Sequence, residues 1–457
     1  MSKKKHVMIW DGNVRDAALS ILLAVDKNQA YSNLLLNDTI KRHKIEPKDR
    51  ALLTEITYGT LQYKMTLDYY LEPYIRGEVE DWMRWLLRLS LYQMHYLSRI
   101  PPHAAVNEAV EIAKRRGHQG TASMVNGILR AILREGVSEV DVFNEIDELA
   151  ITTSHPHWLV ERWVEMYGVE KTRAMLEENN KPAIQTVRVN VTKATVEQVL
   201  TSLAEDGVTA NKSPLLSECI YITEGQASRT AAFRQGWVTI QDESSMIPAH
   251  VLQPQRDWRV LDMCAAPGGK TTHVAERMNN EGTIIALDLH EHKLALIQQN
   301  MTRLGLTNIT TLHVDGRKAI EHFEANSFDA ILVDAPCSGL GVMRRKPDIK
   351  YTKQEQDLAR LQTIQLALLD AAVTLLKPNG KLIYSTCTVD KVENEGTVQQ
   401  FLQQHSTMQS TAIDSLPQAL MEKQQDGMLQ VFPQDFGSDG FFVAAFTKKE
   451  ILTNGSK

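Results

Sequence analysis

The chain has 457 residues, of which 43% are hydrophobic and 23% are charged, a composition typical of a globular protein with two or three domains. No apolar run approaches the roughly 18 residues that a membrane helix needs, and none follows the N-terminal lysines, so neither a membrane protein nor a secreted one is expected. Four cysteines without a C-x-x-C pair argue against structural zinc and a disulfide framework, and they predict a metal-free protein of the reducing cytoplasm.

The net charge of −6 hides an uneven distribution of charged residues. Residues 1–135 hold 20 Lys and Arg against 15 Asp and Glu, a balance of +5, whereas the remainder holds 30 against 41, a balance of −11. A basic N-terminal part indicates a surface suited to phosphates. Lys114, Arg115 and Arg116 form a basic cluster there, although a solvated helix end would have the same composition.

Residues 1–140 are expected to form an all-α domain. Val106, Ala109, Val110 and Ala113 follow the i, i+3, i+4, i+7 spacing of a helix with one buried face. The segment 82–97 is rich in Leu, Met and Tyr and predicts a helix buried nearly all round. Helix content alone indicates no function.

Residues 150–235 predict a small α+β connector. Helices are expected at 156–167 and 195–206, and strands at 186–191 and near 219–223. Within the first strand, the segment RVN (188–190), which begins with Arg188, is a candidate RNA contact.

Residues 236–450 alternate strands and helices, which predicts an α/β fold with a Rossmann-like, doubly wound and mostly parallel sheet. Strands are expected at 259–264, 283–289, 309–314, 328–334 and 381–387, with helices at 292–304 and 354–376. The segment 441–446 would close the sheet as an edge strand. Ligands of such sheets bind beyond the carboxyl ends of the strands.

The loop after the first of these strands predicts a cofactor site. Glycines let a backbone approach a ligand closely, and the helix that follows offers free N–H groups. A P-loop would need glycine at position 264, and the G-x-G-x-x-G fingerprint is also absent. The candidate binding residues are Cys264, Ala265, Ala266, Pro267, Gly268, Gly269 and Lys270.

Three aspartates end or follow successive strands of this sheet, namely Asp288, Asp315 and Asp334. An aspartate in such a position is also a common turn or capping residue. A series of them beside a glycine-rich loop indicates an adenosine-containing cofactor, because an acidic residue after the second strand can hold a ribose. Without a phosphate cradle, S-adenosylmethionine is favoured over a dinucleotide.

Two of the cysteines, Cys337 and Cys387, end strands of the same sheet on its ligand side, so they can lie close together. Buried cysteines are often inert. The chemistry that would use them is methylation of a pyrimidine at carbon 5, where a thiolate adds to carbon 6 so that carbon 5 can attack a methyl group. An acid such as Asp334 would hydrogen-bond or protonate the ring nitrogen N3 and so stabilise the charge that develops on the ring. The residues alone do not rank the two thiols.

These motifs resemble those of the RNA cytosine-5 methyltransferase family. The resemblance is carried by QDESS (241–245), DMCAAPGGKT (262–271), ALD (286–288), DG (315–316), DAPCSG (334–339), STCT (385–388), ENE (393–395) and DGFFVAAF (439–446). The N-terminal part resembles the RNA-binding NusB family through RDAALSILLAV (15–25), RALLTEITYGTL (50–61) and VNEAVEIAKRRG (106–117). A fusion of the two is similar to bacterial enzymes that methylate cytosine in 16S rRNA.

The resemblance implies a class I methyltransferase domain over 236–450 that uses S-adenosylmethionine. It implies that the loop 264–270 wraps the methionine part of the cofactor, that Asp288 holds the ribose, and that Asp315 lies by the adenine. Asp334 would meet both the cytosine and the cofactor. The substrate implied is 16S rRNA, either free or in an early assembly intermediate.

The resemblance also ranks the thiols. Cys387, in STCT, would be the nucleophile, and Cys337, in DAPCSG, would help the product to leave. A monomer without an obligate protein partner is expected.

The target base would have to be unstacked and turned into a pocket. Arg344, Arg345, Lys346 and Lys350 follow DAPCSG, and we expect them at the pocket mouth, in contact with phosphates, or else in a solvated loop.

Two other functions are compatible with part of the sequence. A pure RNA-binding module would leave the catalytic motifs unexplained, and the same chemistry on tRNA or another rRNA site is disfavoured only by the NusB-like fusion.

Overall fold

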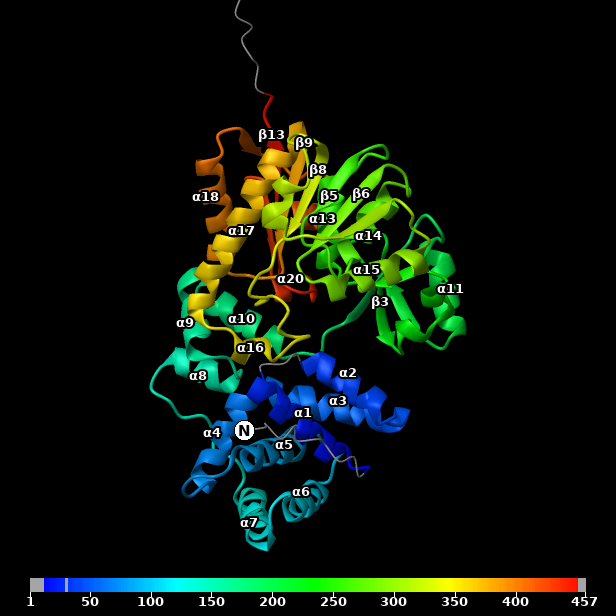
Figure 1. Ribbon diagram of the computed structural model, residues 1–457. Coiled ribbons are helices and arrows are strands. Elements are labelled where there is room, and N and C mark those ends of the chain that lie inside the picture. Colours follow the sequence, from blue (N-terminus) through cyan, green and yellow to red (C-terminus); the bar gives the residue numbers. More distant parts are fainter. Residues whose placement is uncertain (1–11, 29–31, 451–457) are drawn as a thin grey trace, which may run out of the picture. The chain divides into compact units, whose positions relative to one another are not determined.

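The computed structural model describes residues 12–28 and 32–450 (Figure 1). Contacts divide the chain into two units, residues 1–181 with 343–353 and residues 182–342 with 354–457. The first unit is helical, and the second contains two β-sheets. The helices between residues 140 and 181 also belong to the first unit.

The helical unit is built on the expected apolar faces. Its helices are α1 (Val14–Asn28), α2 (Ser32–Arg42), α3 (Pro47–Gln62), α4 (Lys64–Leu71), α5 (Asp81–Tyr96), α6 (Pro102–Arg116), α7 (Gln119–Glu135), α8 (Glu145–Thr152), α9 (His157–Tyr167) and α10 (Val169–Asn179). Ten of the 16 residues of α5 are buried, as its composition predicts. The buried Arg88 on α5 forms two hydrogen bonds of 2.7 and 2.8 Å with Asp68, which satisfies its charge.

The segment 343–353 also belongs to the helical unit, although it follows DAPCSG directly. Lys350, on the short α16 (Ile349–Thr352), is 1% exposed, and its Nζ donates to Gln62 O and Ser154 O at 3.2 Å and to Asn180 Oδ1 at 2.8 Å. The side chain of Arg344 is 3% exposed and pairs with Glu178 at 3.1 Å. For these two side chains, the prediction of phosphate contacts at the pocket mouth and the alternative of a solvated loop are both wrong, because acceptors far away in the sequence bind them instead.

The smaller sheet of the second unit forms the connector and has the antiparallel order β2-β3-β1-β4. Its strands are β1 (Gln185–Val189), β2 (Thr209–Lys212), β3 (Cys219–Glu224) and β4 (Val238–Ile240), and α11 (Val196–Glu205) packs on them. The helix α11 begins with a capping box between Thr195 and Gln198, which satisfies backbone N–H groups at its first turn.

The larger sheet has the order β11-β12-β13-β9-β8-β5-β6-β7, with β10 also paired to β13. The strands β5 (Arg259–Asp262), β6 (Thr283–Asp288), β7 (Ile309–His313), β8 (Phe328–Asp334) and β9 (Leu376–Thr386) are parallel, which confirms the predicted Rossmann-like fold. The antiparallel strands are β10 (Met408–Ser410), β11 (Gln424–Gln425), β12 (Met428–Val431) and β13 (Phe441–Lys448). The prediction that 441–446 forms an edge strand is wrong, since β12 pairs with β13 on the side away from β9.

Helices cover both faces of this sheet (Figure 1). One core contains buried residues of α13 (Ile247–Leu252), α14 (Gly269–Arg277) and α15 (Glu291–Leu304), and the other contains those of α17 (Glu355–Leu375) and α18 (Thr397–Gln404). By length and composition alone, α17 could cross a membrane. Its apolar residues Leu366, Leu369 and Ala372 instead pack in the second core, as in a buried helix of a doubly wound fold.

Candidate active site

The loop between β5 and α14 is shaped by a glycine and by backbone hydrogen bonds. Gly268 has a φ of +101°, and a Cβ there would lie 3.2 Å from Cα of Ile297, so a side chain would be strained. The N–H of Ala265 donates to Leu287 O at 2.8 Å, and Thr271 Oγ1 donates to Asp262 at 2.6 Å. The loop thus leads into α14, whose first N–H groups have no partner within the helix.

Asp288 connects this loop to the end of β6. The residue is 8% exposed, and its carboxylate accepts from the N–H of Ala266 at 3.2 Å and from that of His290 at 2.9 Å. Each oxygen retains a lone pair, so the carboxylate can accept further hydrogen bonds from a ligand.

Asp315 lies at the end of β7 and caps the short helix η4 (Gly316–Glu321). It is paired with Arg317, whose Nη2 lies 2.5 Å from Oδ2, and this partner lowers the pKa of Asp315. A capping role and a ligand role both fit this position, because the carboxylate is an anion in either case.

The strand-end aspartates surround Cys264. Burial, followed by the charges of Asp262, Asp334, Asp288 and Asp315, raises the pKa of the Cys264 thiol well above its usual range. Cys264 is therefore an inert thiol at neutral pH. Lys270 and Arg317 are paired with two of these four carboxylates, so an excess of negative charge remains, which suits a ligand that carries a positive charge.

Lys270 and Asp334 form an ion pair at the end of β8. The Nζ of Lys270 lies 2.9 Å from Oδ2 of Asp334, and Ser385 donates to Oδ1 at 2.8 Å. Burial opposes the charge of Lys270, but Asp334 outweighs it and raises the pKa of the ammonium. The sequence predicted Lys270 only as part of the cofactor loop, and the pairing with Asp334 was missed. The available signal was the position of Lys270, directly after two glycines in the loop that follows a strand.

The two strand-end cysteines are adjacent. Sγ of Cys337 lies 3.3 Å from Sγ of Cys387, and neither forms a disulfide. The contact with Cys387 and then burial raise the pKa of Cys337 well above its usual range, so Cys337 retains its proton and can donate it to the other sulfur. Attraction to Cys387 also contributes to the raised pKa of Lys270, after that of Asp334.

Arg188 binds residues of α14, the helix that follows the loop. Its guanidinium is fully buried and donates to Glu276 at 2.9 Å through both Nε and Nη2, and to Gly269 O at 2.9 Å. It also bonds Gln241 and Thr272. The prediction that Arg188 contacts RNA is wrong, because a complete set of acceptors lies inside the second unit.

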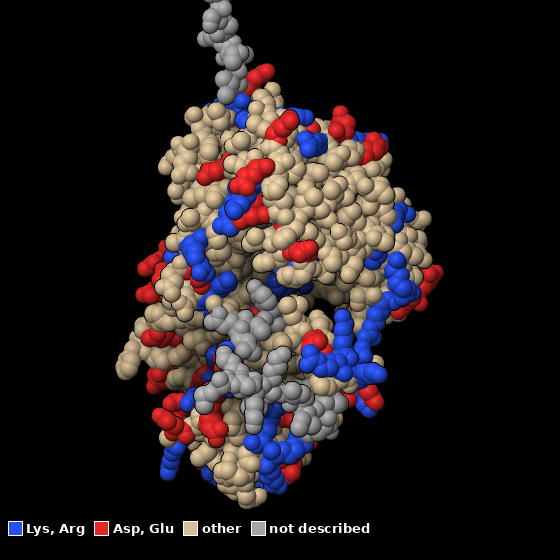
Figure 2. Space-filling view, viewed as in Figure 1, with Lys and Arg blue, Asp and Glu red and all other residues tan. Residues whose placement is uncertain are grey.

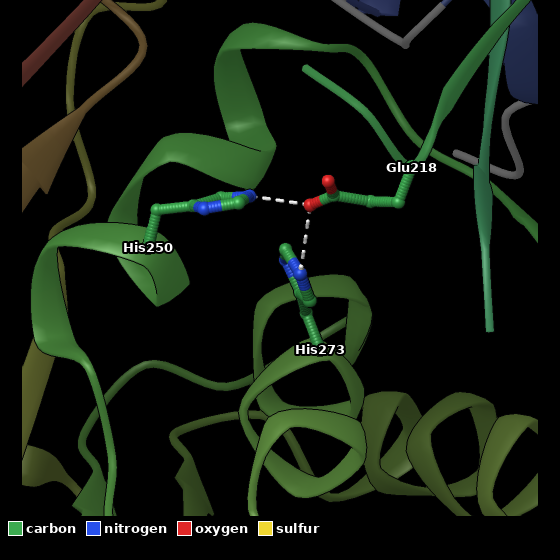
Figure 3. Close-up of side chains that lie close together, drawn as sticks. All are labelled: Glu218, His250 and His273. Carbon is green, nitrogen blue, oxygen red and sulfur yellow. Dashed lines mark hydrogen bonds and ion pairs between the residues drawn. The ribbon is translucent and has the colours of Figure 1, made fainter. Parts of the chain in front are cut away.

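A second buried cluster supports another part of α14 (Figure 3). Glu218 accepts from His250 Nε2 and lies 3.5 Å from Nε2 of His273, and three such groups could in principle hold a metal ion. Nη1 of Arg277 lies 3.4 Å from Nδ1 of His250. A guanidinium can only donate, so Nδ1 accepts and Nε2 carries the proton. This tautomer favours a hydrogen-bonded support over a metal site.

Comparison with known proteins agrees with this architecture. The 16S rRNA methyltransferase RsmB/F model matches residues 249–447, the NusB family model matches 12–134, and the ferredoxin-like domain of RsmF/B-like methyltransferases matches 155–228. A probable ribosomal RNA small subunit methyltransferase B of Bacillus subtilis is 48% identical over 442 residues, 96% of this chain and 99% of that protein. The ribosomal RNA small subunit methyltransferase B of Salmonella typhi is 34% identical, with 95% and 98% covered.

Solved structures share the fold. The crystal structure of PH0851 has a TM-score of 0.82 at 27% identity and covers 97% of this chain and 100% of that one. A methyltransferase homolog protein from Pyrococcus horikoshii has a TM-score of 0.58 at 28% identity, with 67% and 100% covered.

The Rossmann-like sheet, its glycine-rich loop and its matches define a methyltransferase domain joined to a NusB domain. The chain belongs to the RsmB/F family of small-subunit ribosomal RNA methyltransferases.

Proposed function

We propose that this methyltransferase transfers a methyl group from S-adenosylmethionine to carbon 5 of a cytosine in 16S rRNA, through a covalent cysteine adduct at carbon 6. The observation that carries the proposal is the pair of thiols 3.3 Å apart at strand ends β8 and β9, beside the Lys270–Asp334 pair. A nucleophilic thiol, a second thiol for release and a hydrogen-bond donor to the ring, here the ammonium of Lys270, form the set that this chemistry requires.

The residues of the loop fit S-adenosylmethionine. The segment 264–270 and the start of α14 would hold its methionine part, Asp288 its ribose, and Asp315 its adenine region. The carboxylates around Cys264 suit a sulfonium charge, and no phosphate cradle is present among the described loop residues. The cofactor supplies an electrophilic methyl group.

Cys387 is the nucleophile of the proposed mechanism. Its thiolate adds to carbon 6, which makes carbon 5 electron-rich, and carbon 5 then takes the methyl group. The carboxylate of Asp334 accepts from the exocyclic amine of the cytosine, and the ammonium of Lys270 donates to the ring to balance the developing charge. Lys270 also stabilises the thiolate before attack.

Cys337 acts in product release. After methylation, carbon 5 must lose its proton so that the bond between carbon 6 and Cys387 can break and free the thiolate. Cys337 touches the Cys387 sulfur and holds its proton, so it can donate this proton to Cys387 as the bond to carbon 6 breaks, and the thiolate left on Cys337 can take the proton from carbon 5. The resemblance to the RNA enzymes supports the same division of roles.

The helical unit is proposed to bind the RNA. The family match to NusB over 12–134 supports this role, and Figure 2 shows lysines and arginines gathered in places over the helices. Exposed basic residues include Lys41, Lys44 and Arg130. Lys114 and Arg116 pair with Glu111 and Asp16, which partly neutralises the cluster at 114–116.

The remaining expectations complete the proposal. The protein would act in the cytoplasm as a monomer without an obligate protein partner, away from membranes, on free 16S rRNA or an early assembly intermediate. Residues 1–140 would form the RNA-binding domain, 150–235 the connector and 236–450 the catalytic domain.

The test is methyl transfer from labelled S-adenosylmethionine to 16S rRNA, followed by bisulfite mapping of the modified base. Label at carbon 5 of one cytosine supports the proposal. Label on another base or atom would overturn the cytosine-5 assignment. Transfer to tRNA but not to 16S rRNA would overturn the substrate.

A further inference from the structure

The loops that carry the two cysteines are joined by the residues next to each thiol. Oγ of Ser338, which follows Cys337, lies 2.8 Å from Oγ1 of Thr388, which follows Cys387. The N–H of Gly341 donates to the carbonyl of Cys387 at 3.0 Å. Ser338 and Thr388 are fully buried, so both loops have a defined position.

Glu393, from the ENE segment after Cys387, binds the Cys337 loop. It is fully buried, and its carboxylate accepts from the N–H of Ser338 at 2.9 Å and from the hydroxyl of Ser338. Gln365 of α17 donates to the same carboxylate at 2.9 Å and to Pro336 O at 3.1 Å. A buried carboxylate with this many donors fixes its partners strongly, because any lost bond leaves a charge unsatisfied.

Asn394, the next residue, binds the other loop. Its Nδ2 donates to Thr388 O at 3.1 Å, and its Oδ1 accepts from Thr386 Oγ1 at 2.6 Å. Adjacent side chains of one short turn, η5 (Val392–Gly396), therefore hold the two cysteine loops separately.

We infer that Glu393 is a positioning residue that sets the distance of Cys337 from Cys387, and that Asn394 positions the Cys387 loop. This inference rests on the proposed function and deepens it. Glu393 positions Cys337 for product release, and Asn394 positions Cys387 for attack on carbon 6. Glu393 binds Ser338 and Asn394 binds Thr388, so both act through the residues beside the cysteines.

The first test uses thiol oxidation and needs neither RNA nor cofactor. Diamide takes two electrons and two protons from the two thiols, so a disulfide forms while its N=N bond is reduced to a hydrazine. The rate of the Cys337–Cys387 disulfide is measured by mass spectrometry of the full-length chain. Glu393→Ala should slow it by about tenfold or more, the size expected for losing charged hydrogen bonds. The control is Glu422→Ala, an exposed glutamate of the same unit, which should react like the wild type.

Glu393→Gln keeps an acceptor for the Ser338 N–H but presents an NH2 group to other donors, so an intermediate rate is expected. Circular dichroism verifies that each variant is folded. A folded Glu393→Ala protein that forms the disulfide within about twofold of the wild-type rate would overturn the inference.

The second test separates attack from release. With 16S rRNA and cofactor, Glu393→Ala should accumulate a denaturant-resistant protein–RNA adduct, whereas Asn394→Ala should form the adduct more slowly. Equal loss of adduct in both would indicate a general disturbance and overturn the assignment. If the wild type transfers no methyl group to 16S rRNA, the proposed function fails, and the oxidation rates still decide whether Glu393 sets the distance.

Discussion

At the scale of single residues, the two thiols differ in what surrounds them. Cys337 has its pKa raised by Cys387 and by burial, whereas Cys387 lies within the field of Lys270. Cys387→Ala should therefore lose turnover by several orders of magnitude and form no covalent RNA adduct, because the nucleophile is gone. Cys337→Ala should still attack but trap the adduct. Gel electrophoresis of RNA complexes under denaturing conditions measures both, and an adduct only in Cys387→Ala would reverse the roles.

His273 gives a second prediction at this scale. Burial and then Arg188 lower the pKa of His273 to about 3 from an ordinary 6.5, and Glu218 only partly opposes them. The folded state therefore binds fewer protons, so this contribution to stability is present above pH 6.5 and is lost as the pH falls toward 3. Between pH 8 and pH 5.5, the loss should be about 1.4 kcal/mol.

Urea unfolding of the wild type and His273→Asn at both pH values measures this difference. Asp262 works in the opposite sense, since burial raises its pKa to about 7 and it favours folding at low pH. It is present in both proteins, so the comparison cancels its effect. Equal acid sensitivity in the two proteins would contradict the assignment.

At the scale of elements, α14 is the helix on which the cofactor loop depends. Arg188 of β1 and Glu276 of α14 form a fully buried pair, and Arg188 also binds Gly269 O at the start of the helix. Arg188→Met would leave Glu276 as an unpaired buried charge, a loss of about 3–5 kcal/mol. Weaker cofactor binding is expected with it. The double variant Arg188→Met, Glu276→Met should recover much of the stability in thermal unfolding, and no recovery would show that the charge is not the cause.

The elements also show where sequence patterns suffice. The five parallel strands and their helices were predictable, because apolar strand segments that alternate with helical segments and are separated by turn residues indicate a parallel α/β sheet. β11 and β12 were missed, because strands of two and four residues are too short to show a period. Arg188 and Lys350 were taken for surface residues, since the acceptors that make their burial possible lie 53 to 288 residues away in the sequence. Such pairings cannot be seen in a local pattern.

The positions of the two thiols were predictable in part. Cysteines that end strands of one parallel sheet must share an edge, which predicts proximity. The network of Ser338, Thr388 and Glu393 that fixes their distance was not predictable, because serine, threonine and glutamate side chains have many possible partners.

At the scale of the whole molecule, the two units divide the work that the proposal assigns. The residues of the cofactor loop and the partners that hold it, Arg188, Asp288 and Asp334, all lie in the second unit. Removal of residues 1–140 should therefore leave the affinity for S-adenosylmethionine within about threefold, an effect below 1 kcal/mol.

The same deletion should weaken binding of 16S rRNA by about tenfold or more, because the basic N-terminal part supplies phosphate contacts whose counterion release drives affinity. The salt dependence of RNA binding should also become less steep. Lys350 loses Gln62 as a partner in this truncated chain, so Lys350→Gln is added to avoid a buried ammonium with too few acceptors. Calorimetric titration with the cofactor and filter binding with RNA measure the two affinities. A folded truncated protein that no longer binds the cofactor would refute the separation of the two functions.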